Sequence, residues 1–199
     1  LAEHSDTTYA VIGNDGVYLG GLMYFVALPM DKNRNADKVD LAFVRLDPST
    51  AEIIKKQHSF LTVEDLQLGH QVNNKGQYLL FGYPATKTRT KKVYQEDLII
   101  AAPFIYNAKA HLNFRYEKFG FKKFSHIAIN FSGEIITNVN KNSHLAPNMK
   151  GISGSGLWYL PTFPSSEVIT QRKLVGIVIE RINELENKVI VSTSIDLIT

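Results

Sequence analysis

A short run of glycine and serine holds the residue of this chain best suited to nucleophilic chemistry. The run is Gly151–Gly156, with the sequence Gly-Ile-Ser-Gly-Ser-Gly. Glycine permits backbone angles closed to other residues, so a carbonyl group can approach the main chain here. We expect the N–H groups of Gly151 and Ser153 to point at one site about 3 Å away, the geometry of an oxyanion hole, with Ser153 as the candidate nucleophile. Glycine-serine loops are also common without catalysis, so the hexapeptide alone leaves both interpretations open.

Other chemical motifs are absent from the sequence. A nucleophile elbow needs Gly-x-Ser-x-Gly, but position 155 is Ser when the pattern is centred on Ser153. The chain contains no phosphate-binding Gly-x-x-x-x-Gly-Lys-Ser/Thr and no Gly-x-Gly-x-x-Gly. Five histidines lack the spacing of metal ligands, and we interpret them as surface or structural residues: His58, His70, His111, His126 and His144. We expect no cofactor and no metal.

The composition is that of a globular protein with an apolar core. The chain has 199 residues, of which 44% are hydrophobic, and a net charge of +3. This charge is too small to indicate nucleic-acid binding, and the basic run Lys87–Lys92 is typical of a solvated loop. No apolar stretch approaches the roughly 18 residues of a membrane span. The absence of cysteine excludes a thiol nucleophile or disulfide scaffold and favours a reducing compartment such as the cytoplasm.

Short apolar segments separated by turn residues predict an all-β fold, a barrel or a sandwich. The clearest hairpin signal is Asn14-Asp15-Gly16 between two apolar runs. The predicted strands are 9–12, 17–19, 22–28, 39–46, 77–81, 98–102, 124–131, 135–136, 157–160, 173–179 and 188–192. Residues 49–76 are the least strand-like, and we interpret them as a connector between two domains, 1–76 and 77–199.

The predicted strand 39–46 carries one acid near its start, Asp40. A carboxylate buried there is unfavourable unless another group pairs with it. Asp6 and Asp37 lie nearby, but neither stands at the start of an apolar strand. Asp40 is therefore the acid in this region that we expect to have a partner.

Three stretches in one order resemble the trypsin-like (chymotrypsin-fold) serine proteases, in the form of a compact bacterial member. Ala2-Glu3-His4 resembles the end of their Thr-Ala-x-His motif, 40–46 resembles their Asp-containing strand, and 151–154 resembles their Gly-Asp-Ser-Gly loop. Gly82-Tyr83-Pro84 and 174–178 also resemble strands of the second barrel. The resemblance spans nearly the whole chain, and it implies two six-stranded antiparallel β-barrels with the site at their interface.

The resemblance implies a serine endopeptidase acting through a Ser-His-Asp triad on a polypeptide substrate. Ser153 would attack the scissile carbonyl, His4 would accept and return the proton, and Asp40 would lie buried and hold the imidazole. His4 is the one histidine upstream of Asp40. Gly151 and Ser153 would supply the oxyanion-hole N–H groups. The first domain would thus carry the histidine and the aspartate, and the second would carry the nucleophile.

Two departures from the family affect how the site would work. Ile152 replaces the usual acid before the serine, so we expect the loop conformation to be set without a salt bridge to a freed N-terminus. The specificity pocket would be formed by 147–150, including Lys150, and by the strand around Ile179, Glu180 and Arg181. No acid occurs among 147–150, so a trypsin-like preference for Lys or Arg is not indicated.

The family places about three strands of the first barrel before the histidine, and this sequence has three residues there. An incomplete barrel would expose unpaired strand edges. We therefore expect an upstream segment of the natural chain to complete the first barrel.

Two other functions use the same residues differently. A pseudoprotease or peptide-binding module on the same fold would hold a peptide in the cleft without cutting it, because a fold alone confers no chemistry. A lipase-like or esterase activity on another scaffold is disfavoured by the missing elbow motif and by the lack of alternating long helices.

Overall fold

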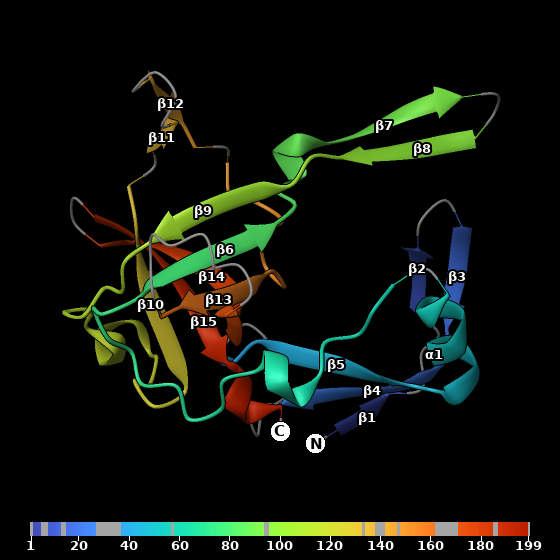
Figure 1. Cartoon of the computed structure of the whole chain (residues 1–199), viewed down its shortest axis with the longest axis horizontal. Helices are drawn as coiled ribbons and strands as arrows, with labels where there is room; N and C mark the ends of the chain where they lie inside the picture. The colour runs from blue at the N-terminus through green and yellow to red at the C-terminus, as the bar shows by residue number, and fades with distance from the viewer. Residues whose placement is uncertain are drawn as a thin grey trace. The chain divides into compact units, whose positions relative to one another are not determined.

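The computed structural model divides the chain into two compact units, Leu1–Glu64 and Asp65–Thr199 (Figure 1). It describes residues 2–4, 8–12, 15–26, 37–56, 58–93, 96–132, 134–137, 142–146, 148–161, 171–184 and 187–198. The described elements are mostly strands, and their pairing is antiparallel, so the prediction of an all-β fold is confirmed.

The first unit contains a three-stranded sheet and a separate hairpin. In the sheet, β4 (Gly21–Val26) lies between β1 (Ala2–His4) and β5 (Leu41–Leu46). The hairpin joins β2 (Thr8–Ile12) to β3 (Asp15–Leu19), which is where the Asn-Asp-Gly turn predicts one. The central strand β4 therefore separates the strand that ends at His4 from the strand that follows Asp40.

One α-helix follows β5 in the described part of the chain. This helix, α1 (Pro48–Lys55), begins where Asp47 caps it by accepting the N–H of Thr50 at 2.7 Å, with proline in the first turn. The helix lies largely within the part of the sequence, 49–76, that is least strand-like. Among the described residues, no helix is long and apolar enough to cross a membrane.

The second unit is built on one curled sheet of six strands. Their spatial order is β10 (His126–Phe131), β15 (Asn187–Ser194), β14 (Lys173–Glu184), β13 (Gly156–Leu160), β6 (Gln77–Gly82) and β9 (Phe104–Ala108). The chain after β9 pairs with β10 through a bridge between Ala110 and Ile129. The sheet is thus curled like a half-barrel, and this bridge links the chain just after one outer strand to the other outer strand (Figure 1).

Two hairpins extend from the second unit. One joins β7 (Thr88–Val93) to β8 (Glu96–Ala101), and the other joins β11 (Glu134–Thr137) to β12 (Asn142–Leu145). The basic run Lys87–Lys92 therefore lies largely in a strand, and its interpretation as a solvated loop is wrong. The alternation of Thr with Arg and Lys in this run fits one strand of a two-stranded ribbon.

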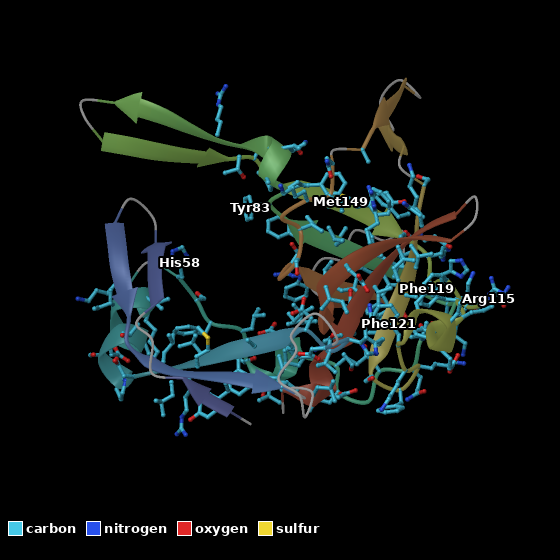
Figure 2. The ribbon with its side chains drawn as sticks, turned by 180° about the vertical axis from the view of Figure 1, so that it is seen from behind. His58, Tyr83, Arg115, Phe119, Phe121 and Met149 are labelled. Carbon is cyan, nitrogen blue, oxygen red and sulfur yellow. The ribbon has the colours of Figure 1, made fainter. Side chains whose placement is uncertain are left out.

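Buried apolar side chains of the six-stranded sheet form the main core. Alternate residues of β9 are buried, as are Tyr78 and Leu80 of β6. A second cluster surrounds a short 3₁₀ helix, Tyr116–Phe119, in a polar and aromatic part of the chain. There Phe114 stacks on Phe119 with ring centroids 5.4 Å apart, and Phe119 and Phe121 lie together in Figure 2.

Residues 65–76 belong to the second unit, so the boundary falls earlier than the expected 76/77. The N–H of Gln67 donates to the carbonyl of Leu174 at 3.0 Å, and the N–H of Gly69 donates to Asp196 Oδ1 at 2.7 Å. His70 is buried and its Nε2 lies 2.7 Å from the hydroxyl of Tyr78. These contacts attach the connector to the six-stranded sheet.

The pH dependence of stability tests the burial of His70. Burial lowers the pKa of His70 below its ordinary value of 6.5, against an opposing effect of Asp196. The unfolded chain therefore binds a proton more readily than the folded protein, and stability falls as the pH drops below about 6.5. The variant His70→Gln keeps a hydrogen-bond acceptor for Tyr78 and removes this proton site.

We expect the Tm of the wild type to fall more than that of His70→Gln between about pH 7.5 and about pH 5.5. Thermal denaturation followed by circular dichroism measures this difference. Parallel pH profiles for the two proteins would contradict the burial-induced shift.

Candidate active site

The serine loop, residues 148–155, consists of two consecutive turns. The N–H of Ile152 donates to the carbonyl of Met149 at 3.1 Å, and the N–H of Ser155 donates to the carbonyl of Ile152 at 3.1 Å. Gly151 and Gly154 occupy the third position of each turn with φ of 83° and 87°. A positive φ at that position is the property of a type II turn and favours glycine, so the spacing of the two glycines follows from the backbone they form.

The loop is fixed to two parts of the sheet. On one side, the N–H of Gly154 donates to the carbonyl of Val178 at 2.9 Å, and the N–H of Val178 donates to the carbonyl of Ser155 at 2.8 Å. On the other side, the N–H of Ala85 donates to the carbonyl of Lys150 at 2.8 Å. Strand β14 and the corner after β6 therefore position the loop together.

Ile152 holds the centre of the loop in the core. Its side chain is only 3% exposed and belongs to the main apolar cluster, whereas the neighbouring Ser153 is exposed. Burial of an isoleucine side chain contributes about 1.5–3 kcal/mol. Apolar packing at this position accords with the expectation of a loop conformation set without a salt bridge.

Within the stretch 150–155, two N–H groups are left without a partner among the described residues. Those of Lys150, Ile152, Gly154 and Ser155 all donate to protein acceptors. The N–H groups of Gly151 and Ser153 donate to no described residue, and neither does the Ser153 hydroxyl bond to one. Both residues are exposed, so an incoming oxygen atom can reach these donors. They are the two residues that the sequence predicts as the oxyanion hole.

A cavity of about 320 Å³ lies against the serine loop. It is bounded by the loop and by a stretch of β14, and its lining is Asn148, Met149, Lys150, Gly151, Ile152, Ser153, Ile179, Glu180 and Arg181. The structure thus brings together every described residue predicted for the substrate pocket. Pro147 lies outside the described residues. Met149, labelled in Figure 2, marks the part of the second unit where this cavity lies.

The other two predicted catalytic residues both lie in the first unit. His4 is the last residue of β1, where only its backbone is described, and it pairs with Met23 of β4. Met23 pairs in turn with Val44 of β5, four residues beyond Asp40. Four residues of a strand span about 13 Å, and two strand spacings add about 10 Å across the sheet. At this register the backbones of His4 and Asp40 are too far apart for the two side chains to form a hydrogen bond with each other.

Asp40 is exposed, whereas the family resemblance predicts a buried acid. It has φ of 41°, a left-handed conformation that aspartate tolerates, and this turns the chain just before β5. The buried acid of this region is Asp37, which is 7% exposed and accepts the N–H of Val39 at 3.0 Å. The sequence favours Asp40 over Asp37 as the buried acid, because Asp37 does not stand at the start of an apolar strand. Asp6 lies outside the described residues.

The histidines interpreted as surface or structural have different environments. His58 is exposed, His111 is half-buried, and His70 and His126 are buried. A cavity of about 540 Å³ in the second unit is lined in part by His70, His126 and Asp196. There Ser194 donates to Asp196 at 2.9 Å and His70 bonds Tyr78. The hydroxyl of Ser125 lies 3.0 Å from Nδ1 of the neighbouring His126, and the same nitrogen lies 3.0 Å from the carbonyl of Lys122. Among the described residues, no cluster of His, Asp and Glu could hold a metal ion.

Comparison with known proteins identifies no relative: no protein-family model, no curated protein and no solved structure matches this chain.

Substituting the two glycines of the loop tests the turn geometry. A Cβ at either position is strained by the positive φ, at a cost of about 1–2 kcal/mol. At Gly151 the added Cβ would also lie 3.1 Å from the Cβ and backbone N of Ala85, whereas at Gly154 it would meet open space.

We therefore expect Gly151→Ala to destabilise the protein more than its matched control Gly154→Ala does, by about 1 kcal/mol. Urea denaturation of the two variants measures this difference. Equal losses, or a larger loss for Gly154→Ala, would contradict the close approach of Gly151 to Ala85.

Proposed function

We propose that the protein is a serine endopeptidase of the trypsin-like class, with Ser153 as its nucleophile. The observation that carries this proposal is that the N–H groups of Gly151 and Ser153 donate to no described residue, beside an exposed serine hydroxyl and a cavity. Backbone donors placed where negative charge develops contribute strongly to acyl transfer, because they need no reorganisation during the reaction. The proposed fold is two six-stranded barrels of the chymotrypsin type, and the curled sheet of the second unit supports the second of these.

The proposed reaction proceeds in two steps through an acyl-enzyme. The Ser153 hydroxyl attacks the scissile carbonyl carbon while His4 accepts its proton, and the carbonyl oxygen becomes an oxyanion bound by the two N–H groups. Collapse of this intermediate breaks the peptide bond, and His4 returns the proton to the leaving amine. Water then attacks the ester with His4 again as base, and this releases the acid product and restores Ser153.

Asp40 is the proposed third member of the triad, with the role of holding the His4 imidazole. This assignment requires the two residues to come within hydrogen-bonding distance in the active protein, closer than the register of β1, β4 and β5 places their backbones. It also requires Asp40 to become less exposed. The order His, Asp, Ser along the sequence supports the assignment.

The exposure of Asp40 and its separation from His4 favour a second candidate function. In that case the protein is a pseudoprotease, whose pocket holds a peptide that it does not cut. A fluorophosphonate probe separates the two candidates, since a peptidase carries the label on Ser153 and loses it in His4→Ala. A pseudoprotease carries no label in either protein.

We expect Ser153→Ala to abolish hydrolysis and to leave the fold unchanged, because an exposed hydroxyl on a turn contributes little to packing. Removal of a triad nucleophile lowers turnover by about 10⁶-fold. Ser155→Ala is the matched control, a serine of the same loop whose hydroxyl has no role in the proposal, and it should retain activity. Rates on a casein-derived peptide mixture, followed by mass spectrometry, measure both. Activity that persists in Ser153→Ala would exclude this nucleophile.

We expect Asp40→Asn to lower turnover by about 10⁴-fold at neutral pH, because an amide would hold the imidazole in the wrong tautomer. The same substitution at the buried neighbour, Asp37→Asn, provides the comparison, and its expected effect is on stability. Steady-state rates and Tm values of both variants are the measurements. An unchanged rate for Asp40→Asn would remove this residue from the mechanism.

A further inference from the structure

The cavity beside Ser153 combines an apolar interior with charged side chains. Met149, Ile152 and Ile179 contribute buried apolar side chains, each less than 9% exposed. Lys150 and Arg181 contribute exposed cationic side chains, one from each wall. A side chain entering this cavity would therefore meet methyl and methylene groups along its length and positive charge beside them.

The two cations are available to a ligand. Within the part of the chain that the structure describes, neither Lys150 nor Arg181 takes part in an ion pair. The hydrogen bonds of Lys150 involve its backbone alone, with its N–H donating to Asn148 Oδ1 at 3.1 Å and its carbonyl accepting from Ala85. Its ammonium group can thus be removed by substitution without disturbing the anchoring of the serine loop.

Glu180 is the one acid in the lining, and it differs from the two cations. It is half-buried and already interacts with another group of the chain, whereas Lys150 and Arg181 are exposed. The lining therefore carries one more positive than negative charge, and the positive charges are the accessible ones.

We propose that this cavity selects acidic side chains, so that the enzyme cleaves after glutamate or aspartate. The inference rests on the proposed function, since it assigns the substrate class of the same site. A carboxylate taken from water needs charged donors to compensate its desolvation, and the guanidinium of Arg181 can bind it with two parallel N–H donors. Lys150 adds a second charge from the opposite wall, and the methylene groups of a glutamate side chain pack on the apolar interior.

The test uses peptides that are identical except for glutamate, glutamine or lysine before the scissile bond. Glutamine has the shape of glutamate without its charge, so their ratio of kcat/KM isolates the electrostatic contribution. We expect kcat/KM for the glutamate peptide to exceed that for the glutamine peptide by about tenfold, which corresponds to the free energy that two partly exposed ion pairs contribute. The lysine peptide should be the poorest substrate. The preference should decrease in high salt because these charges are accessible to solvent.

Variants assign the preference to named residues. Arg181→Met and Lys150→Met should each reduce the ratio about threefold, and the double variant should bring it to about one. Glu180→Gln should increase it by removing the opposing charge. Lys75→Met is the control, since Lys75 is an exposed lysine of the same unit outside this lining.

Binding of the same peptides to Ser153→Ala, measured by isothermal titration calorimetry, separates this proposal from the proposed function. Cleavage without a preference for glutamate would overturn the pocket assignment and leave the peptidase intact. A glutamate-selective affinity that Arg181→Met reduces, without cleavage by the wild type, would support the pocket and overturn the peptidase. Glutamine and glutamate peptides that bind equally to Ser153→Ala would overturn the acidic preference.

Discussion

The backbone hydrogen bonds of the serine loop are the constraint on which the site depends. They connect the loop to β14 through Val178 and to the corner after β6 through Ala85, and they close two turns within it. Each bond contributes only about 0.5–1.5 kcal/mol, but together they fix which N–H groups are used. Within 150–155, those of Gly151 and Ser153 donate to no described residue, and both residues are exposed. The proposed acyl transfer at Ser153 needs these two N–H groups to bind the oxyanion.

The packing of Ile152 explains how the loop keeps this shape. Ile152 lies between the two turns, and its side chain is held in the core. The next residue, Ser153, therefore lies at the surface. Gly82 of β6 adds a second restraint, because a Cβ there would collide with the Ser155 side chain and lie 3.0 Å from Ile152 Cδ1. Strand β6 thus lies so close to the loop that only glycine fits at position 82. The loop, β6 and β14 form one packed assembly.

The turn at the serine loop could be predicted from the sequence because its information is local, whereas its pocket followed only from the resemblance to trypsin-like serine proteases. The glycines at 151 and 154 mark a turn, and the resemblance implies Ile179–Arg181 as the other wall of the pocket. Other features have no such local signal. The charged strand β7 lacks apolar alternation, and the connector 65–76 joins the second unit through contacts with distant residues such as Leu174 and Asp196. Asp40 is exposed and has a positive φ of 41°, and neither property has a sequence pattern. These depend on tertiary pairing, which periodicity does not report.

A crystal structure of the protein after reaction with a fluorophosphonate tests the central claim most directly, because its phosphoryl oxygen stands where an oxyanion would form. The account predicts phosphorus bonded to Ser153 Oγ and the phosphoryl oxygen about 2.7–3.1 Å from the backbone N atoms of both Gly151 and Ser153. A label on another residue, or a phosphoryl oxygen turned into solvent beyond hydrogen-bonding distance of both N–H groups, would contradict it.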